Sequence, residues 1–342
     1  MTEHSSTTVL VTGASGFIGM HCILQLLEQG YQVRGTVRSA AKAENLRQIV
    51  QKHSQHTQNL SFVEADLLQD AGWAEAASGC DFVLHVASPL PLSEPKDENE
   101  LIRPAVEGTL RVLRAANDAG VRRVVQTSSV AAIVHGHDRG KLFDESDWSN
   151  LEKPVAAYPK SKTLAEKAAW EFVNQPEVNL ELATINPSYV LGPILDASNT
   201  SASAEVVLTI LRRQYPGMPR LNFAVVDVRD VAAAHLAAMT TPEAAGKRFI
   251  CSSGNLWMRD MALALKAEFG PQGHKITTRA LPDWLLRVVA LFDAKVALVV
   301  DNLGEVQQLS NQQLKAVLHW QPRSPEEAVI AMAQSFIDLG SV

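Results

Sequence analysis

Cysteine is scarce in this chain of 342 residues. Its three cysteines, Cys22, Cys80 and Cys251, are odd in number and far apart, which argues against a disulfide framework and favours a reducing compartment. The start, MTEHSSTT, has no basic segment followed by an apolar run, so we expect no signal peptide and a cytoplasmic location.

A strong excess of charge is also absent. Lys and Arg number 31 against 37 Asp and Glu, and the net charge of -6 gives no reason to expect nucleic acid. Residues 8–27 lack charged side chains, but three glycines and a strand-turn-helix pattern argue against a membrane span. The length suits one large domain or two lobes.

Short β-rich runs alternate with helix-like stretches through the first half of the chain. We predict strands over Thr8–Thr12, Gln32–Val37, Leu60–Glu64, Asp81–Val86, Arg123–Thr127 and Glu181–Ile185, most of them nearly continuous apolar runs. The helices predicted in this half cover Phe17–Gln29, Ala41–His53, Trp73–Ser78, Leu101–Ala119 and Tyr158–Asn174. This alternation predicts an α/β fold of Rossmann type, a doubly wound parallel sheet with right-handed crossovers.

The pattern loosens after Ile185, where prolines become frequent. We predict a dinucleotide-binding domain over residues 1–185, with residues 222–250 returning to it through strands at Asn222–Asp227 and Arg248–Cys251. Residues 186–221 and 251–342 are then a smaller, mostly helical substrate-binding lobe.

A glycine-rich turn follows the first predicted strand. Gly13, Gly16 and Gly19 have the spacing GxxGxxG and lead into an apolar helix. Glycine permits the tight turn and the close approach of a phosphate, and the helix N-terminus attracts negative charge. We therefore predict dinucleotide contacts from the three glycines and from Ser15, Phe17 and Ile18; the alternative is a plain glycine-rich turn.

The end of the second strand indicates which dinucleotide is bound. NAD-specific sites usually place a carboxylate there, but this chain has Arg38 and no acidic residue before Glu44. A guanidinium can bind a 2′-phosphate through a forked pair of hydrogen bonds. Arg38 therefore favours NADP(H), with Lys42 as a possible helper; the alternative is a solvated surface arginine.

Two further strand ends should line the same cofactor, because ligands bind at the carboxyl ends of open α/β sheets. Asp66 would accept a hydrogen bond from the adenine amino group, with Leu67 beside it. The small residues after the fourth strand would let the backbone approach the ribose and pyrophosphate. These residues are Val86, Ala87 and Ser88.

Tyr158 and Lys162 are four residues apart at the start of a predicted helix, so they share a face. Free tyrosine has a pKa of about 10, and a cation within roughly 4–6 Å can lower a neighbouring pKa by about 1–3 units. We expect Lys162 to lower the pKa of Tyr158 and to bind the nicotinamide ribose. Tyr158 would then protonate a carbonyl oxygen as hydride arrives. The alternative for this pair is an ordinary amphipathic helix start.

The fifth strand ends in Thr127-Ser128-Ser129, which supplies a hydroxyl to hold that oxygen. Ser129 is our choice and Ser128 the second choice, and we assign Thr127 to the cofactor site.

These residues resemble the extended type of the short-chain dehydrogenase/reductase superfamily, and most of all its group of dihydroflavonol, cinnamoyl-CoA and carbonyl (methylglyoxal) reductases. The matching stretches include TGASGFIG at 12–19, HVASP at 85–89, TSS at 127–129, YPKSKTLAE at 158–166 and INPSYVLGP at 185–193. The resemblance implies Ser129, Tyr158 and Lys162 as the catalytic trio, NADPH as the cofactor, and Pro187 and Val190 against the nicotinamide.

Two positions depart from the pattern of that group. Val134 stands where plant flavonoid reductases have an asparagine that holds the flavonoid, which argues against a flavonoid substrate. Asn45 stands where a lysine often completes the 2′-phosphate site. The resemblance therefore implies reduction of a small-molecule carbonyl compound and leaves the substrate open. We expect a monomer or a homodimer.

Several residues also fit other kinds of site or function. A metal site at His135, His137 and Asp138 is disfavoured, because the spacing does not put two ligands on one regular face. The apolar residues around Trp257 and Trp284 would wall a substrate pocket, form a dimer contact or pack in a core. The competing functions are a nucleotide-sugar epimerase or dehydratase with tightly held NAD, and a non-catalytic NADP-binding regulator.

Overall fold

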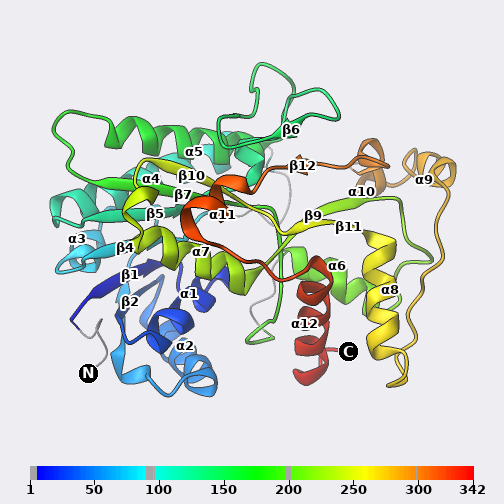
Figure 1. Ribbon diagram of the computed structural model, residues 1–342, viewed down its shortest axis with the longest axis horizontal. Coiled ribbons are helices and arrows are strands. Elements are labelled where there is room, and N and C mark those ends of the chain that lie inside the picture. The colour runs from blue at the N-terminus through cyan, green and yellow to red at the C-terminus, as the bar shows by residue number, and fades with distance from the viewer. Residues whose placement is uncertain (1–5, 90–94, 96, 198–201, 298) are drawn as a thin grey trace.

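A seven-stranded sheet forms the centre of the molecule (Figure 1). The computed structural model describes residues 6–89, 95, 97–197, 202–297 and 299–342. The strands lie in the order β10-β7-β5-β4-β1-β2-β3, and every neighbouring pair is parallel. Their bounds are β1 Thr8–Thr12, β2 Gln32–Val37, β3 Leu60–Glu64, β4 Phe82–His85, β5 Arg123–Thr127, β7 Glu181–Pro187 and β10 Lys247–Cys251.

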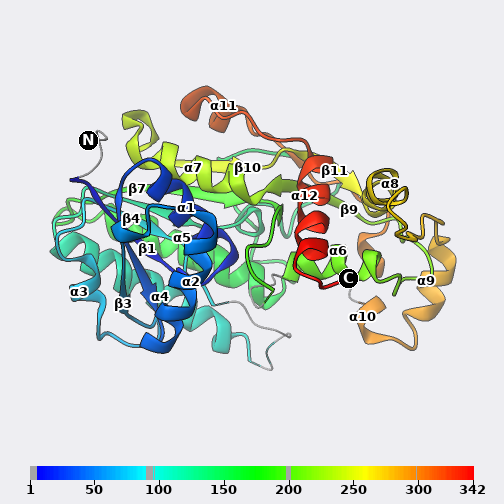
Figure 2. The ribbon, with the colours of Figure 1, turned by 90° about the horizontal axis from the view of Figure 1, so that it is seen from below.

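Helices cover both faces of this sheet (Figure 2). Val9 and Val11 of β1 pack into one core, and Leu10 between them packs into the opposite one, because successive strand residues point to opposite faces. The first face carries α1 (Phe17–Glu28), α2 (Ala40–His53) and α7 (Val228–Thr240); the second carries α3 (Trp73–Ala77), α4 (Asn99–Asp118) and α5 (Ala157–Val173). The predicted doubly wound parallel sheet is confirmed.

A smaller lobe lies beside the sheet and has its own apolar core. Its three-stranded sheet has the order β11-β9-β8, with β9 parallel to β8 and antiparallel to β11. Helix α12 packs against both α6 and α8. The bounds are β8 Tyr189–Leu191, β9 Asn222–Asp227, β11 Gly254–Trp257, α6 Ala202–Leu211, α8 Met258–Phe269 and α12 Pro325–Asp338.

The segment that returns to the main sheet begins later than the sequence indicated. Strand β9 belongs to the smaller sheet, whereas α7 packs on the large sheet and β10 is its edge strand. The chain passes from β9 of the smaller sheet to α7 at Asp227. Its side chain caps α7 by accepting a hydrogen bond from the Arg229 amide. An apolar run such as β9 shows that a strand is present, but not which sheet it joins.

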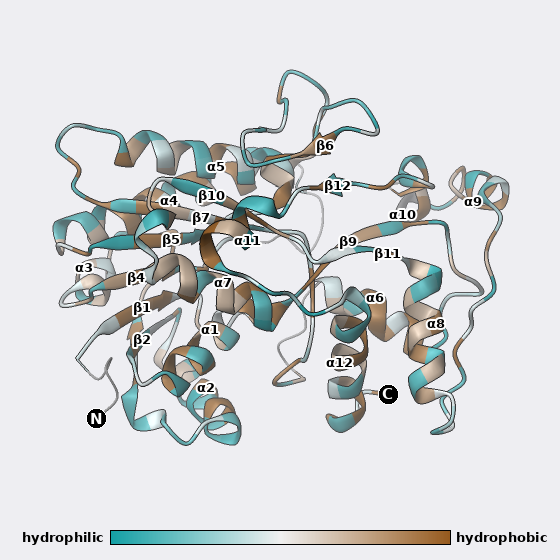
Figure 3. Ribbon diagram, viewed as in Figure 1, coloured by the Kyte–Doolittle hydropathy of each residue, from teal (hydrophilic) through white to brown (hydrophobic). Residues whose placement is uncertain are grey.

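Short elements complete the described chain. They are β6 Leu142–Phe143, which pairs with β12 Gln308–Leu309, the helices α9 Asp283–Val289, α10 Ala294–Ala297 and α11 Gln312–Leu318, and four 3₁₀ turns at Thr57–Asn59, Val130–Ala132, Pro242–Ala244 and Val300–Asn302. The loops around β6 are largely hydrophilic, whereas several central strands are hydrophobic (Figure 3).

Three of the apolar residues around Trp284 are largely exposed: Trp284 is 67%, Leu291 77% and Phe292 87% exposed. The interpretation that they pack in a core is therefore wrong. Among the described residues, no helix combines the length and apolar character needed to cross a membrane.

Candidate active site

One open cavity of about 1330 Å³ runs along the carboxyl ends of the central strands and reaches the smaller lobe. It is large enough for a dinucleotide together with a small substrate. The sheet side of its wall includes Gly13, Ser15, Gly16, Phe17, Ile18, Arg38, Asp66, Leu67, Val86, Ala87 and Ser88. The side toward the lobe includes Ser129, His135, Tyr158, Ser188, Tyr189, Val190, Phe223, Asn302, Glu305 and Gln307.

The glycine turn is shaped by close backbone approach. Gly13 has a φ of +69°, and a Cβ on it would lie 2.9 Å from Ala87 Cα. A Cβ on Gly19 would lie 2.4 Å from the Gly13 oxygen, so Gly19 serves the packing of α1 on the turn. No side chain among the described residues caps α1, and its first turn holds no acidic residue. The turn therefore fits a dinucleotide phosphate, because it leaves amide groups and the positive helix end to the cavity.

The end of β2 presents a cation to the cavity. Arg38 is exposed on the cavity wall, and its guanidinium has no hydrogen-bond partner among the described residues. Arg34 of β2, in contrast, is bound within the protein, because it donates to the carbonyl oxygens of Glu75, Ala76 and Ser78. Lys42 is exposed and does not belong to the cavity wall that the described residues form.

Asp66 lines the cavity beyond the end of β3. Its Oδ1 accepts a hydrogen bond of 3.0 Å from the Leu68 amide, which fixes the carboxylate in the turn. The geometry is compatible with the adenine contact predicted from the sequence, and that contact stays a prediction.

Tyr158 and Lys162 lie in the first turns of α5, as their spacing predicted. Pro159 occupies the first turn, where its missing amide hydrogen costs no helical bond. The Lys162 Nζ atom lies 5.9 Å from the centroid of the Tyr158 ring and donates a hydrogen bond of 3.0 Å to Ser88 Oγ. Lys162 is 9% exposed, so its charge is held inside the protein beside the cavity wall.

A buried histidine next to Lys162 stays neutral. Burial and the Lys162 charge lower the pKa of His85 to about 3, and its Nδ1 lies 2.8 Å from Thr12 Oγ1. At neutral pH this imidazole therefore adds no second cation beside Lys162.

The three hydroxyl residues at the end of β5 point in different directions. Thr127 Oγ1 lies 2.7 Å from His235 Nε2 in α7, and Ser128 Oγ donates to the buried Glu166 carboxylate at 2.5 Å. Ser129 lines the cavity, and its Oγ accepts a hydrogen bond of 3.1 Å from the Ala131 amide. Of the two serines, only Ser129 offers its hydroxyl to a ligand in the described cavity.

Four of the predicted site residues are not in the wall that the described residues form: Gly19, Thr127, Lys162 and Pro187. Gly19 packs on the turn, Thr127 binds His235, and Lys162 reaches the wall through Ser88. Pro187 is buried at the end of β7. Their roles stay predictions.

His135 is the clearest wall residue that the sequence did not reveal. It lines the same cavity as Ser129, whereas the neighbouring Val134 is buried in a small apolar cluster with Ile133, Phe143 and others. Burial lowers the pKa of His135, and its ring has no hydrogen-bond partner among the described residues. Within the part of the chain that the structure describes, neither His135 nor His137 belongs to a group that could hold a metal ion.

The family model for the NAD dependent epimerase/dehydratase family matches residues 9–251. The chain belongs to this family. The matched residues include the strands of the main sheet, the glycine turn and Tyr158.

Relatives within the NAD dependent epimerase/dehydratase family are reductases by name. Dihydroflavonol 4-reductase of Callistephus chinensis is 34% identical over 86% of this chain and 82% of its own length. Cinnamoyl-CoA reductase 1 of Petunia hybrida is 38% identical over 79% of each chain. The crystal structure of yeast methylglyoxal/isovaleraldehyde reductase complexed with NADPH has a TM-score of 0.79 and 30% identity, and the match covers 98% of this chain and 100% of that one. The resemblance to this group is confirmed.

Proposed function

We propose that this chain is an NADPH-dependent reductase that converts a small aldehyde or ketone to the alcohol. The observation that carries the proposal is the meeting of three groups at one cavity: the Tyr158 phenol, the Ser129 hydroxyl, and the Lys162 ammonium behind Ser88. The reductase activities for which the relatives are named support the same reaction class.

NADPH, when bound, supplies the hydride that the carbonyl carbon accepts. The glycine turn and α1 hold its pyrophosphate, Arg38 its 2′-phosphate, and Asp66 the adenine. The other contacts proposed are Val86, Ala87 and Ser88 near the ribose, and Thr127, Pro187 and Val190 toward the nicotinamide end. Arg38 has no protein partner among the described residues, so its charge is available to a phosphate.

The chain's own groups act on the carbonyl oxygen. Ser129 donates a hydrogen bond to this oxygen and holds it beside Tyr158, which stabilises the negative charge that develops there. Tyr158 then gives its phenolic proton to the oxygen, so the C=O double bond becomes C–OH. Lys162 stabilises the phenolate left behind, because its ammonium lies close to the ring and is shielded from water.

The test is a panel of neutral aldehydes and ketones, with loss of NADPH absorbance as the readout, repeated with NADH. We expect turnover with NADPH, and a loss of about a hundredfold or more in Tyr158→Phe, as is usual for removal of a general acid. A loss of less than about tenfold would contradict the role of Tyr158.

Copurified NAD with no net turnover would instead favour an epimerase. NADPH binding without turnover of any carbonyl would favour a non-catalytic regulator. A cytoplasmic location and a monomeric or homodimeric state stay predictions.

A further inference from the structure

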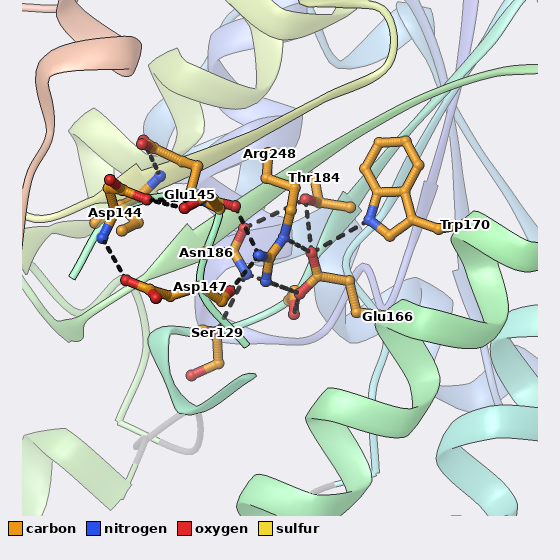
Figure 4. Close-up of polar contacts among 12 residues, drawn as sticks. Ser129, Asp144, Glu145, Asp147, Glu166, Trp170, Thr184, Asn186 and Arg248 are labelled. Atoms are coloured by element: carbon orange, nitrogen blue, oxygen red, sulfur yellow. Dashed lines mark hydrogen bonds and ion pairs between the residues drawn. The ribbon is translucent and has the colours of Figure 1, made fainter. Parts of the chain in front are cut away.

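A buried ion pair lies beside the proposed active site (Figure 4). Glu166 of α5 has a side-chain exposure of 0% and Arg248 of β10 one of 9%, and the Arg248 Nε atom is 2.7 Å from Glu166 Oε1. The Arg248 Nη1 atom donates to the Glu145 and Asp147 carbonyl oxygens, and Nη2 donates to Glu166 Oε2 at 3.4 Å. The guanidinium carbon lies 3.7 Å from the centroid of the Trp148 ring. The arginine is thus held on all sides by the protein.

Both oxygens of the Glu166 carboxylate are fully engaged. Thr184 Oγ1 donates to Oε1 at 3.0 Å, in addition to Arg248. Ser128 Oγ and Asn186 Nδ2 donate to Oε2 at 2.5 and 2.8 Å. Burial raises the pKa of Glu166, but the Arg248 charge and these hydrogen bonds outweigh it and lower the pKa overall.

A buried ion pair is seldom the most stable solution for a core, because removing two charges from water is costly. Well-packed apolar side chains of similar volume often serve stability equally well. The arrangement around Glu166 therefore calls for a reason other than stability.

The position of Glu166 on α5 suggests that reason. It follows Lys162 by four residues and Tyr158 by eight, so the three side chains lie along one stripe of the helix. The helix that carries the phenol thus also carries the buried carboxylate.

The carboxylate is connected to Ser129 through Asn186 of β7. The Asn186 Nδ2 atom donates both to Glu166 Oε2 and, at 3.2 Å, to the carbonyl oxygen of Ser129. Figure 4 shows the Ser129 side chain pointing away from this network. The network therefore holds the Ser129 backbone and leaves its hydroxyl to the cavity.

We propose that Glu166 is a positioning residue that, through Asn186, fixes Ser129 relative to Tyr158. The proposal rests on the reductase function above, since it assigns the network to that reaction. Displacement of a catalytic group by about 1 Å can cost on the order of a hundredfold in rate, so a rigid link between α5 and the end of β5 matters for turnover.

Two residues of β7 offer a matched test. Asn186 and Thr184 are both 0% exposed and both donate to Glu166, but only Asn186 bonds to Ser129. We expect Asn186→Ala to lower kcat by about tenfold to a hundredfold while KM for NADPH stays unchanged. Thr184→Val should keep kcat, although both variants lose thermal stability. Equal kcat values in the two variants of a working reductase would overturn the proposal.

A second readout does not depend on catalysis. The Ala131 amide donates to Ser129 Oγ, so hydrogen exchange of the segment 129–132 reports how firmly Ser129 is held. We expect faster exchange there in Asn186→Ala than in Thr184→Val, and equal exchange would overturn the proposal. If the wild-type chain reduces no carbonyl, the proposed function fails, and the exchange measurement still decides the link to Ser129.

A milder variant covers the case in which Asn186→Ala does not fold. Asn186→Ser keeps a polar side chain, but one that is too short to bond to both Glu166 Oε2 and the Ser129 carbonyl oxygen. The same faster exchange and lower kcat are expected, and unchanged exchange of the segment 129–132 would overturn the proposal.

Discussion

Lys162 Nζ donates a hydrogen bond to Ser88 Oγ and so joins α5 to the segment that follows β4. The ammonium also lies 5.9 Å from the centre of the Tyr158 ring. The lysine thus joins two parts of the site, because it lies beside the proposed proton donor and bonds to a residue of the cavity wall. Loss of this side chain should therefore affect both chemistry and cofactor binding.

We expect Lys162→Met to lower kcat by about a hundredfold and to raise the Kd of NADPH. Lys160→Met is the matched control. Lys160 lies on the same helix but forms a surface ion pair with Glu98, and such pairs contribute little to stability. Steady-state kinetics and titration of NADPH fluorescence measure the two effects. Equal changes of kcat and Kd in both variants would show that the effect is not specific to Lys162.

Cofactor choice should depend on Arg38. A hydrogen-bonded contact to a charged group is worth about 1.5–3 kcal/mol, so Arg38→Ala should raise the Kd of NADPH by about tenfold to a hundredfold. NADH lacks the 2′-phosphate and should bind unchanged. Lys42→Ala is the control, because Lys42 lies off the described cavity wall. A parallel weakening of NADH would contradict recognition of the phosphate.

The sequence predicted the central sheet well, for a physical reason. β1, β2, β3 and β5 have the predicted bounds, because each is a short β-rich run that ends at turn residues. The glycine turn and the pair Tyr158 and Lys162 were also predictable, because each is local in the chain.

Features that join distant segments were not predictable from one sequence. Glu166 and Arg248 are 82 residues apart, and nothing in either local pattern indicates the other. The same holds for β6 and β12, which are two residues long each, and for a cavity wall shared by Phe223 and Gln307. The resemblance already favoured Ser129 over Ser128, but the bond of the Ser128 hydroxyl to Glu166, which lies on another element, was not predictable.

His135 should contribute to substrate binding. Its ring has no hydrogen-bond partner among the described residues, and the residue lines the same cavity as Ser129. Burial lowers the pKa of His135, which favours the neutral ring at pH 7. We expect His135→Ala to raise KM for carbonyl compounds that carry a second hydrogen-bonding oxygen, with the Kd of NADPH unchanged. His137→Ala is the control, since that ring is bound to the Trp148 carbonyl oxygen and packs against Phe143. Equal KM values in wild type and His135→Ala would exclude this contact.

Buried neutral histidines should make the fold sensitive to acid. His235 is fully buried in α7, where burial lowers its pKa from 6.5 to about 4. Its Nδ1 lies 2.8 Å from the Val231 carbonyl oxygen, which can only accept, so Nδ1 carries the hydrogen and Nε2 accepts from Thr127. Protonation of Nε2 would remove this acceptor, so the Thr127 hydroxyl could no longer donate to the ring.

The sign of the effect follows from linkage. Between pH 6.5 and about 4 the unfolded chain binds a proton at His235 and the folded chain does not, so stability falls as the pH falls through this range. At 1.36 kcal/mol per pKa unit the contribution is about 3 kcal/mol. His235→Gln cannot titrate, so its free energy of unfolding should change less between pH 7 and pH 5 than that of wild type. Urea unfolding at the two pH values measures the difference, and equal slopes in the two proteins would exclude His235 as the source.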